Sequence, residues 1–253
     1  MLRDEHGRLL FSTRLKQRDQ RHIQAILRWL RMLGLQIQTI YVDFWAAYPL
    51  AIRAIYPDAQ IQYDFFHVIQ NIHRHLYKAL TAYRKAFKDA ASEPAQRKAR
   101  AALHKKLWEN RYLLFTNDEN LSDEQQRVLH ELLAEHADTV VEQIVSFRHC
   151  LRDIFNDSES FEQAADQIAL LIVEGWTDLA EAFRKVLMFL QEHLDNIFTY
   201  LRVPGVQRHS LAECTIRGIR RLESVRQGFK TQRGRIEHLK LLLWRRYLCP
   251  VKP

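Results

Sequence analysis

The sequence is poor in the residues that most often interrupt regular structure. Its 253 residues include only 7 glycines and 6 prolines, which favours long helices joined by short connections. Three widely spaced cysteines, none in a CxxC pair, are too few for a disulfide framework. No apolar run approaches the roughly 20 residues of a membrane span, and the start lacks the pattern of a secretory signal. The sequence therefore predicts a soluble, globular, cytoplasmic protein.

Positive charge is concentrated at one end of the sequence. The chain carries 38 Lys and Arg against 30 Asp and Glu, and residues 208–253 alone hold 12 against 3. Such a basic segment predicts a polyanionic partner such as DNA, because Lys and Arg that contact phosphates release condensed counterions. A solvated helix face or an acidic protein partner is the alternative explanation for the same charge.

The first 64 residues have the pattern of a small α/β unit. Residues 3–15 predict a β-hairpin, and the next segment predicts a helix that ends at Gly34, with an apolar stripe of Ile23, Ile26, Leu27, Leu30 and Leu33. Two short β-like runs follow, at 38–43 and 59–64, separated by a helical stretch. A short helical crossover makes such strands parallel.

Helical periodicity then extends almost without interruption from Phe65 to about Tyr200. Breaks rich in turn and cap residues are predicted at 92–94, 116–122, 156–160 and 175–178. In the basic tail, a helix is predicted from near Ser210, followed by a glycine-containing loop at 228–234 and a closing helix.

Two aspartates stand at the ends of the predicted parallel strands. Asp43 and Asp64 would lie side by side at the edge of the sheet where ligands of α/β proteins bind. Converging carboxylates are suitable ligands for Mg²⁺, and a pair of such ions can promote phosphoryl transfer. The alternative is that each aspartate only caps the helix that follows it.

Several residues near these aspartates are further candidates. His67 is one turn beyond Asp64 in a D-x-x-H spacing, from which it can orient the acid or touch a phosphate. His73 and His75 lie nearby, but their spacing is not a standard zinc pattern. Trp45 and Tyr48 can stack on an unpaired base, or they can simply fill the interface between sheet and helix.

A third acid, Glu213, lies within the basic tail. Ser210 and Glu213 have the spacing of a capping box, which is one explanation for the glutamate. The other is that Glu213 binds a metal cation, while Arg217, Arg220 and Arg221 one to two turns later contact a nucleic-acid backbone.

These motifs occur in an order that resembles the DDE transposases of prokaryotic insertion sequences. The similarity rests on four segments in sequence, YVDFWAAY, PDAQIQYDFFHV, NRYLLFTNDENLSDEQQ and SLAECTIRGIRRL. It is strongest to the ISL-type group, whose RNase-H-like catalytic fold is interrupted by a long all-α insertion. The resemblance spans nearly the whole chain.

The resemblance implies an α/β, mostly helical fold in three parts. Residues 1–67 would form a partial RNase-H-like core, 68–204 an all-α insertion, and 205–253 basic helices that complete the core. The implied function is DNA strand cleavage and transfer with Mg²⁺ or Mn²⁺ as cofactor. Double-stranded DNA at transposon ends and target sites would be the partner, bound by a homo-oligomer associated with the nucleoid.

The resemblance also assigns roles to individual residues. Asp43 would be the second acid of the triad and Glu213 the last, and these two would hold the metal. Asp64 and His67 would form the D-x-x-H element. The DNA contacts are predicted to come from the basic residues of the tail, namely Arg217, Arg220, Arg221, Lys230, Arg233 and Arg235.

The sequence departs from the family pattern at two places. Arg208 and His209 stand where the family usually has asparagines before the final glutamate. The chain also begins at the 3–15 hairpin, whereas the family's first catalytic aspartate lies on a strand before it. We therefore expect DNA binding without cleavage by this chain alone. A non-catalytic DNA-binding regulator derived from a transposase is the second hypothesis, and a helical interaction protein is the third.

Overall fold

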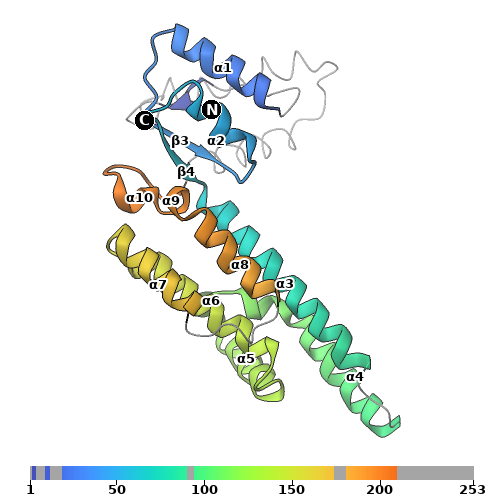
Figure 1. Cartoon of the computed structure of the whole chain (residues 1–253). Helices are drawn as coiled ribbons and strands as arrows, with labels where there is room; N and C mark the ends of the chain where they lie inside the picture. The colour runs from blue at the N-terminus through green and yellow to red at the C-terminus, as the bar shows by residue number, and fades with distance from the viewer. Residues whose placement is uncertain (1, 4–8, 12–18, 90–93, 174–180, 210–253) are drawn as a thin grey trace, which may run out of the picture. The chain divides into compact units, whose positions relative to one another are not determined.

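A computed structural model describes residues 2–3, 9–11, 19–89, 94–173 and 181–209 of the chain (Figure 1). The predicted helices and loop that follow Ser210 lie outside these residues. The chain forms two compact units. The first takes residues from 1–38, 45–59 and 209–253, and the second from 39–44 and 60–208. None of the helices in the described residues is both long and apolar enough to cross a membrane.

The described part of the first unit contains a hairpin and two helices. Strands β1 (Leu2–Arg3) and β2 (Leu9–Phe11) pair antiparallel, so the predicted hairpin is present. Helices α1 (Gln20–Met32) and α2 (Ala47–Arg53) pack against each other. The guanidinium of Arg31 donates to the carbonyl oxygen of Ile55 at 2.7 Å and ties α1 to the residues after α2.

Both ends of α1 follow from the local sequence. The Asp19 carboxylate accepts a hydrogen bond from the backbone N–H of His22 at 2.9 Å and caps the first turn. Gly34, with φ of +78°, ends the helix as predicted, because its left-handed conformation carries no Cβ penalty. Ile23, Leu27 and Leu30 of the predicted stripe are buried, but Leu33 is 57% exposed. The stripe stops one turn early because Leu33 already has non-helical backbone at the C-cap.

In the second unit, β3 (Thr39–Val42) and β4 (Gln60–Tyr63) form a parallel pair. Their register aligns Thr39 with Gln60 and Val42 with Tyr63. The predicted strand pair and its direction are therefore confirmed. The RNase-H-like arrangement of further strands stays a prediction.

Strand β4 is fastened to the end of the helical part of the chain. The hydroxyl of Thr199 donates to the carbonyl oxygen of Ile61 at 2.7 Å. The fully buried amide of Gln62 donates to the carbonyl oxygen of Ile197 at 2.8 Å and accepts from the N–H of Tyr200 at 2.9 Å. All three partners belong to the short helices α9 (Leu194–Ile197) and α10 (Thr199–Arg202). A buried amide with both ends paired fixes this segment against the strand.

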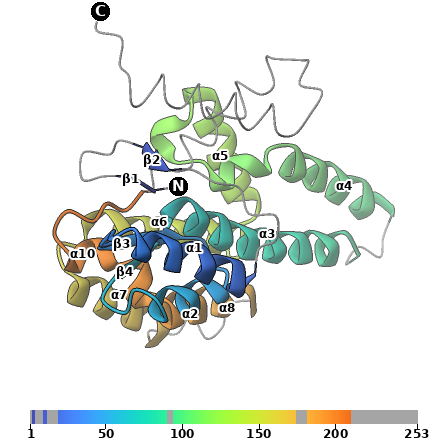
Figure 2. The same ribbon diagram turned by 90° about the horizontal axis from the view of Figure 1, so that it is seen from above.

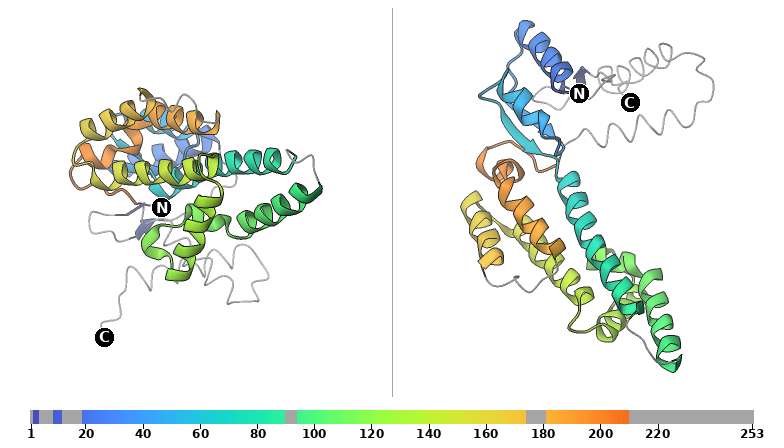
Figure 3. Two further views of the ribbon diagram at one scale, coloured as in Figure 1. Left: turned by 90° about the horizontal axis from the view of Figure 1, so that it is seen from below. Right: turned by 45° about the vertical axis from the view of Figure 1, so that its right-hand side comes forward.

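The rest of the second unit is helical. Helix α3 packs against α4, α6 and α8, and Figure 2 and Figure 3 show α4 running back beside α3. Large buried side chains such as Phe147, Phe183 and Leu80 form its core. The elements are α3 (Phe65–Asp89), α4 (Pro94–Glu109), η1 (Arg111–Phe115), η2 (Asp118–Asn120), α5 (Asp123–Glu135), α6 (Val140–Asp157), α7 (Phe161–Val173) and α8 (Glu181–Glu192).

The predicted breaks at 116–122 and 156–160 are confirmed, and the breaks at 92–94 and 175–178 fall wholly or largely outside the described residues. Three further breaks in the described residues are absent from the sequence prediction: at His193 after α8, at Phe198 before α10, and between α5 and α6. There Asp138 has φ of +57°, and the Thr139 hydroxyl accepts from the N–H of Val141 at 3.2 Å to cap α6. The continuous apolar periodicity on both sides conceals this turn.

Candidate active site at the strand ends

Asp43 and Asp64 occupy equivalent positions at the ends of neighbouring strands. Each follows one member of the last register pair, Val42 with Tyr63. The backbone N–H of Asp64 donates to the carbonyl oxygen of Val42 at 2.9 Å, so the pairing of the strands extends to this aspartate. Both residues belong to the second unit. The fold thus places two carboxylate-bearing residues together at the carboxyl edge of the parallel pair.

Asp64 also starts helix α3. Its carboxylate Oδ1 accepts from the backbone N–H of Phe66 at 3.0 Å, and its carbonyl oxygen accepts from the N–H groups of His67 and Val68 at 2.9 and 3.2 Å. The residue is only 7% exposed. The helix-capping role that the sequence left open is therefore present at Asp64. Because one carboxylate oxygen is enough for the cap, the same side chain keeps a second oxygen for another role.

The chain returns to these strands just before the predicted third acid. The backbone N–H of Gln207 donates to the hydroxyl of Tyr41 at 2.9 Å. Burial raises the pKa of that phenol, the hydrogen bond from Gln207 opposes the rise, and the nearby charge of Asp64 adds to it. Tyr41 thus joins β3 to the segment that precedes Glu213 in the sequence.

Arg208 fixes the same segment on its other side. Its guanidinium lies 4.2 Å from the centre of the Phe65 ring, a cation–π contact with the first residue of α3. It also donates to the carbonyl oxygen of Phe155 at 2.8 Å and to Asn156 Oδ1 at 3.0 Å. Sequence reasoning noted Arg208 only as a departure from the family pattern. Its position after a predicted helix gave no signal of this anchoring role.

A family model described as a transposase matches residues 2–233. The chain belongs to the ISL3-type DDE transposase family. No curated protein and no solved structure matches the sequence. The family match covers both strand-end aspartates, the helical part and Glu213, so the resemblance seen in the sequence is confirmed at the level of the family.

Other residues of the transposase singled out from the sequence lie outside the described part of the chain. They are Glu213, Arg217, Arg220, Arg221, Lys230, Arg233 and Arg235. Their roles as metal ligand and DNA contacts stay predictions.

The histidines near the site do not assemble into a metal centre. His67 is half-buried, with its ring edge-on to Phe66 at 5.4 Å. His73 packs against the Phe115 ring at 5.3 Å, and burial, with a smaller effect from Arg148, lowers its pKa. Within the described ranges, no three His, Cys, Asp or Glu side chains are grouped closely enough to hold an ion.

The strand-end carboxylates are the type of ligand that a divalent cation such as Mg²⁺ prefers. Mg²⁺ and Mn²⁺ prefer oxygen ligands, and transposase chemistry on phosphates needs a cation that retains exchangeable water. Asp43 and Asp64 supply two such groups at adjacent strand ends. The sequence candidate for a further ligand, Glu213, lies outside the described residues.

Trp45 and Tyr48 form a pair within the first unit. Their rings meet edge to face at 5.2 Å, and the N–H of Tyr48 donates to the carbonyl oxygen of Trp45 at 2.9 Å. Both are only half-buried. Mutual packing accounts for their positions, and stacking on an unpaired base stays a hypothesis.

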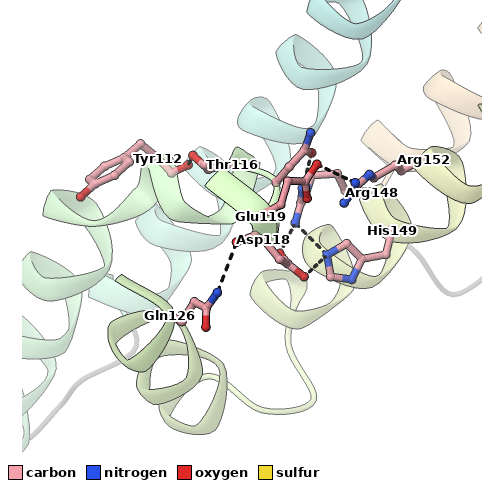
Figure 4. Close-up of polar contacts among 9 residues, drawn as sticks. Tyr112, Thr116, Asp118, Glu119, Gln126, Arg148, His149 and Arg152 are labelled. Carbon is pink, nitrogen blue, oxygen red and sulfur yellow. Dashed lines mark hydrogen bonds and ion pairs between the residues drawn. The ribbon is translucent and has the colours of Figure 1, made fainter. Parts of the chain in front are cut away.

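The motif NRYLLFTNDENLSDEQQ, far along the chain from these aspartates, has a structural role that the close-up in Figure 4 shows. The buried guanidinium of Arg148 on α6 donates to Asn117 Oδ1 at 3.0 Å and lies 3.4 Å from the Asp118 carboxylate. Arg152, one turn later, pairs with Glu119 at 2.6 Å. These contacts bind η2 to α6 and explain the polar half of the motif.

Proposed function

We propose that this transposase cleaves and joins DNA at the ends of an insertion sequence through a DDE site. Asp43 and Glu213 would be acids of the triad and ligands of the cation, with Asp64 and His67 beside them. The observation that supports this most directly is the in-register pairing of Val42 with Tyr63, which sets Asp43 and Asp64 on adjacent strand ends. The family match supports the reaction class.

Each residue in the proposal has a task that its position allows. A bound divalent cation would activate the attacking oxygen and stabilise charge on the phosphate. Asp43 would bind the cation at the strand end. Asp64, held by its helix cap, would keep its remaining oxygen toward the same edge, and His67 one turn later would contact a phosphate.

The sequence leaves only a short linker between the anchored Arg208 and Glu213. Arg208 is anchored on Phe65, directly after Asp64. Five residues can span at most about 18 Å when fully extended. The linker length is therefore compatible with a third acid meeting the two aspartates.

The basic tail would supply the contacts to the DNA backbone. Arg217, Arg220, Arg221, Lys230, Arg233 and Arg235 follow Glu213 in sequence. We propose that several copies of the chain act together on paired transposon ends in the nucleoid. The first acid of the triad would come from a strand preceding the 3–15 hairpin of the sequence.

A cleavage assay tests the proposal with two polypeptides. One is residues 1–253, and the other carries the family's aspartate-bearing first strand fused before Met1. Both are incubated with duplex DNA bearing the element's ends and Mg²⁺ or Mn²⁺. We expect both to bind DNA and only the fused polypeptide to cleave it. Asp43→Asn and Glu213→Gln should each abolish cleavage, whereas Glu124→Gln, a control at an exposed ion pair on α5, should leave it intact.

The other outcomes separate the hypotheses. Cleavage by residues 1–253 alone, abolished by Asp43→Asn, would place the first acid within this sequence and contradict the expected impairment. Binding with no cleavage by either polypeptide would favour the non-catalytic regulator. Absence of DNA binding by both would overturn the proposal.

A further inference from the structure

The helical part of the transposase is strongly polarised in charge. Residues 65–111, which contain α3 and α4, carry 11 Lys and Arg against 3 Asp and Glu. Residues 112–202 carry 6 against 18. The two segments partly offset each other and leave a net charge of only −4 for residues 65–202, which conceals the separation. One part of the helical region is thus suited to a polyanion, and the other would repel it.

Helix α3 concentrates the positive charge on an exposed surface. Between Phe65 and Lys88 its sequence contains no acidic residue. Arg74, Lys78 and Lys85 are all exposed, and their spacing of four and seven residues places them on one side of the helix. We call these three residues the α3 stripe. Gln70 and Thr81, also exposed, lie on the same side and add neutral hydrogen-bonding groups.

The charges of the α3 stripe have no carboxylate partner among the described residues. In this part of the chain, the hydrogen-bond partner of Arg74 is the neutral amide of Asn71. By contrast, Lys106 on α4 pairs with Glu131 and Glu135, both at 2.8 Å.

The pKa of His75 is affected by the positive charges around the α3 stripe. His75 follows Arg74 on α3, and Lys185 belongs to α8, which packs along α3. Burial lowers the pKa of His75, and the charges of Lys78, Arg74 and Lys185 lower it further. Figure 1 and Figure 3 show α8 alongside α3.

The α3 stripe lies on the helix that starts at the candidate active site. Helix α3 begins immediately after Asp64, so the stripe extends away from the strand ends on the same rigid element. Its 25 residues span about 37 Å, close to one turn of B-DNA. From Arg74 to Lys85 the axial distance is about 16 Å, or roughly half a turn of the duplex.

We propose that the α3 stripe is a second DNA-binding surface, which holds the phosphate backbone of the duplex leaving the active site. This inference rests on the proposed function and names a DNA contact separate from the basic tail. The acidic face of a second copy is the competing occupant, because residues 112–202 are rich in carboxylates. DNA is favoured because the stripe lies on the helix that begins directly after Asp64, with Arg74 about 15 Å along that helix from the aspartate.

The test compares two triple variants of the full chain with equal charge change. Arg74→Gln, Lys78→Gln and Lys85→Gln remove the α3 stripe. Arg127→Gln, Arg152→Gln and Arg202→Gln remove three cations that are already paired with Glu124, Glu119 and Asp195. Binding to duplex DNA is measured against salt concentration, and circular dichroism with thermal melting establishes that each variant is folded.

We expect the α3 stripe variant to bind duplex DNA at least about tenfold more weakly than the matched variant near 0.15 M salt. The slope of log K against log salt should flatten by about 0.9 for each phosphate that the variant no longer neutralises. If the triple variant is unfolded, Lys78→Gln with Lys85→Gln spares the Arg74–Asn71 hydrogen bond and should flatten the slope by about two-thirds as much.

Three outcomes would overturn the inference. Equal DNA affinity and slope for both variants would leave the proposed function standing without a DNA-binding role for α3. Loss of salt-sensitive self-association in sedimentation, with unchanged DNA binding, would assign the stripe to a second copy. Failure of the unaltered chain to bind DNA would overturn the proposed function together with this inference.

Discussion

The guanidinium of Arg208 lies 4.2 Å from the centre of the Phe65 ring, although the two residues are far apart in the sequence. Phe65 follows Asp64 directly, and Arg208 comes shortly before Glu213. The cation–π interaction therefore joins the start of α3 to the segment that leads to the predicted third acid. None of the candidate acids takes part in this interaction, so its effect on the segment before Glu213 can be measured without changing them.

Arg208→Ala should loosen the segment before Glu213. The substitution removes the cation–π interaction and the hydrogen bonds to Phe155 and Asn156. We expect faster amide hydrogen exchange at Gln207, whose N–H donates to Tyr41, and a stability decrease of about 1–2 kcal/mol. Arg202→Ala, which breaks an exposed ion pair with Asp195, is the control. Unchanged exchange at Gln207 would show that Tyr41 alone holds the segment.

Substitutions at Asp64 should separate its capping role from its proposed chemical role. Asp64→Ala removes the acceptor for the N–H of Phe66 and should lower stability by about 1 kcal/mol. Asp64→Asn keeps a capping oxygen but loses the charge, so it should melt near the unaltered protein while weakening activity of the fused polypeptide. Equal melting temperatures for the alanine and asparagine variants would contradict the cap.

The local part of the fold is readable from sequence because short-range rules determine it. The hairpin, α1 with its Asp19 and Gly34 ends, and the parallel β3–β4 pair all follow from spacing, caps and crossover length. The break at Asp138 cannot be predicted in this way, because the helical periodicity continues on both sides of this residue, which has left-handed backbone. The ends of such helices depend on tertiary packing, and the periodicity of the sequence gives no information about that packing.

The candidate site shows a similar division. Asp43 and Asp64 lie together because each follows one of two paired parallel strands, a pattern that can be recognised in the sequence. Tyr41, Gln62 and Arg208 give no such signal, because their partners lie far away in the sequence or across several helices. The charge of α3 is concealed for another reason, since residues 65–111 and 112–202 offset each other in the sum.

Arg148 should be among the most sensitive positions of the helical part. It is 6% exposed, burial lowers its pKa, and the nearby Asp118 carboxylate opposes this shift. Arg148→Ala leaves Asn117 without its partner and loosens η2 from α6, so we expect a decrease of about 2–4 kcal/mol in the free energy of unfolding. Arg127→Ala, at an exposed pair, should change stability by less than about 1 kcal/mol. Comparable decreases for both would contradict an anchoring role for Arg148.

Stability should fall as the medium becomes acidic, partly through His136. This side chain is 1% exposed, its Nδ1 lies 3.0 Å from the Tyr83 hydroxyl, and its Nε2 is buried with no hydrogen-bond partner in the described part of the chain. Burial lowers its pKa from 6.5, with Glu135 opposing the shift and Lys106 adding to it.

The sign of the pH effect follows from that direction. Above the ordinary value of 6.5, His136 is neutral in both folded and unfolded chains. Below it, the unfolded chain takes up a proton that the folded chain resists, so stability is lost as pH falls. His136→Gln should reduce the drop in melting temperature between about pH 7 and 5, while exposed His130→Gln should not. An unaltered drop in the His136 variant would assign the effect to other groups.

The basic tail should make a separate and additive contribution to DNA binding. Arg217, Arg220 and Arg221 follow Glu213 in a segment with 12 Lys and Arg against 3 acids. Replacing the three arginines by alanine should flatten the slope of log K against log salt by up to about one unit per arginine that binds a phosphate. If the tail and the α3 stripe bind separate phosphates, the two effects should add in the combined variant. If neither the tail variant nor the α3 stripe variant changes affinity or slope, the helical interaction protein is favoured. If only the α3 stripe variant binds more weakly, α3 is the main DNA-binding surface.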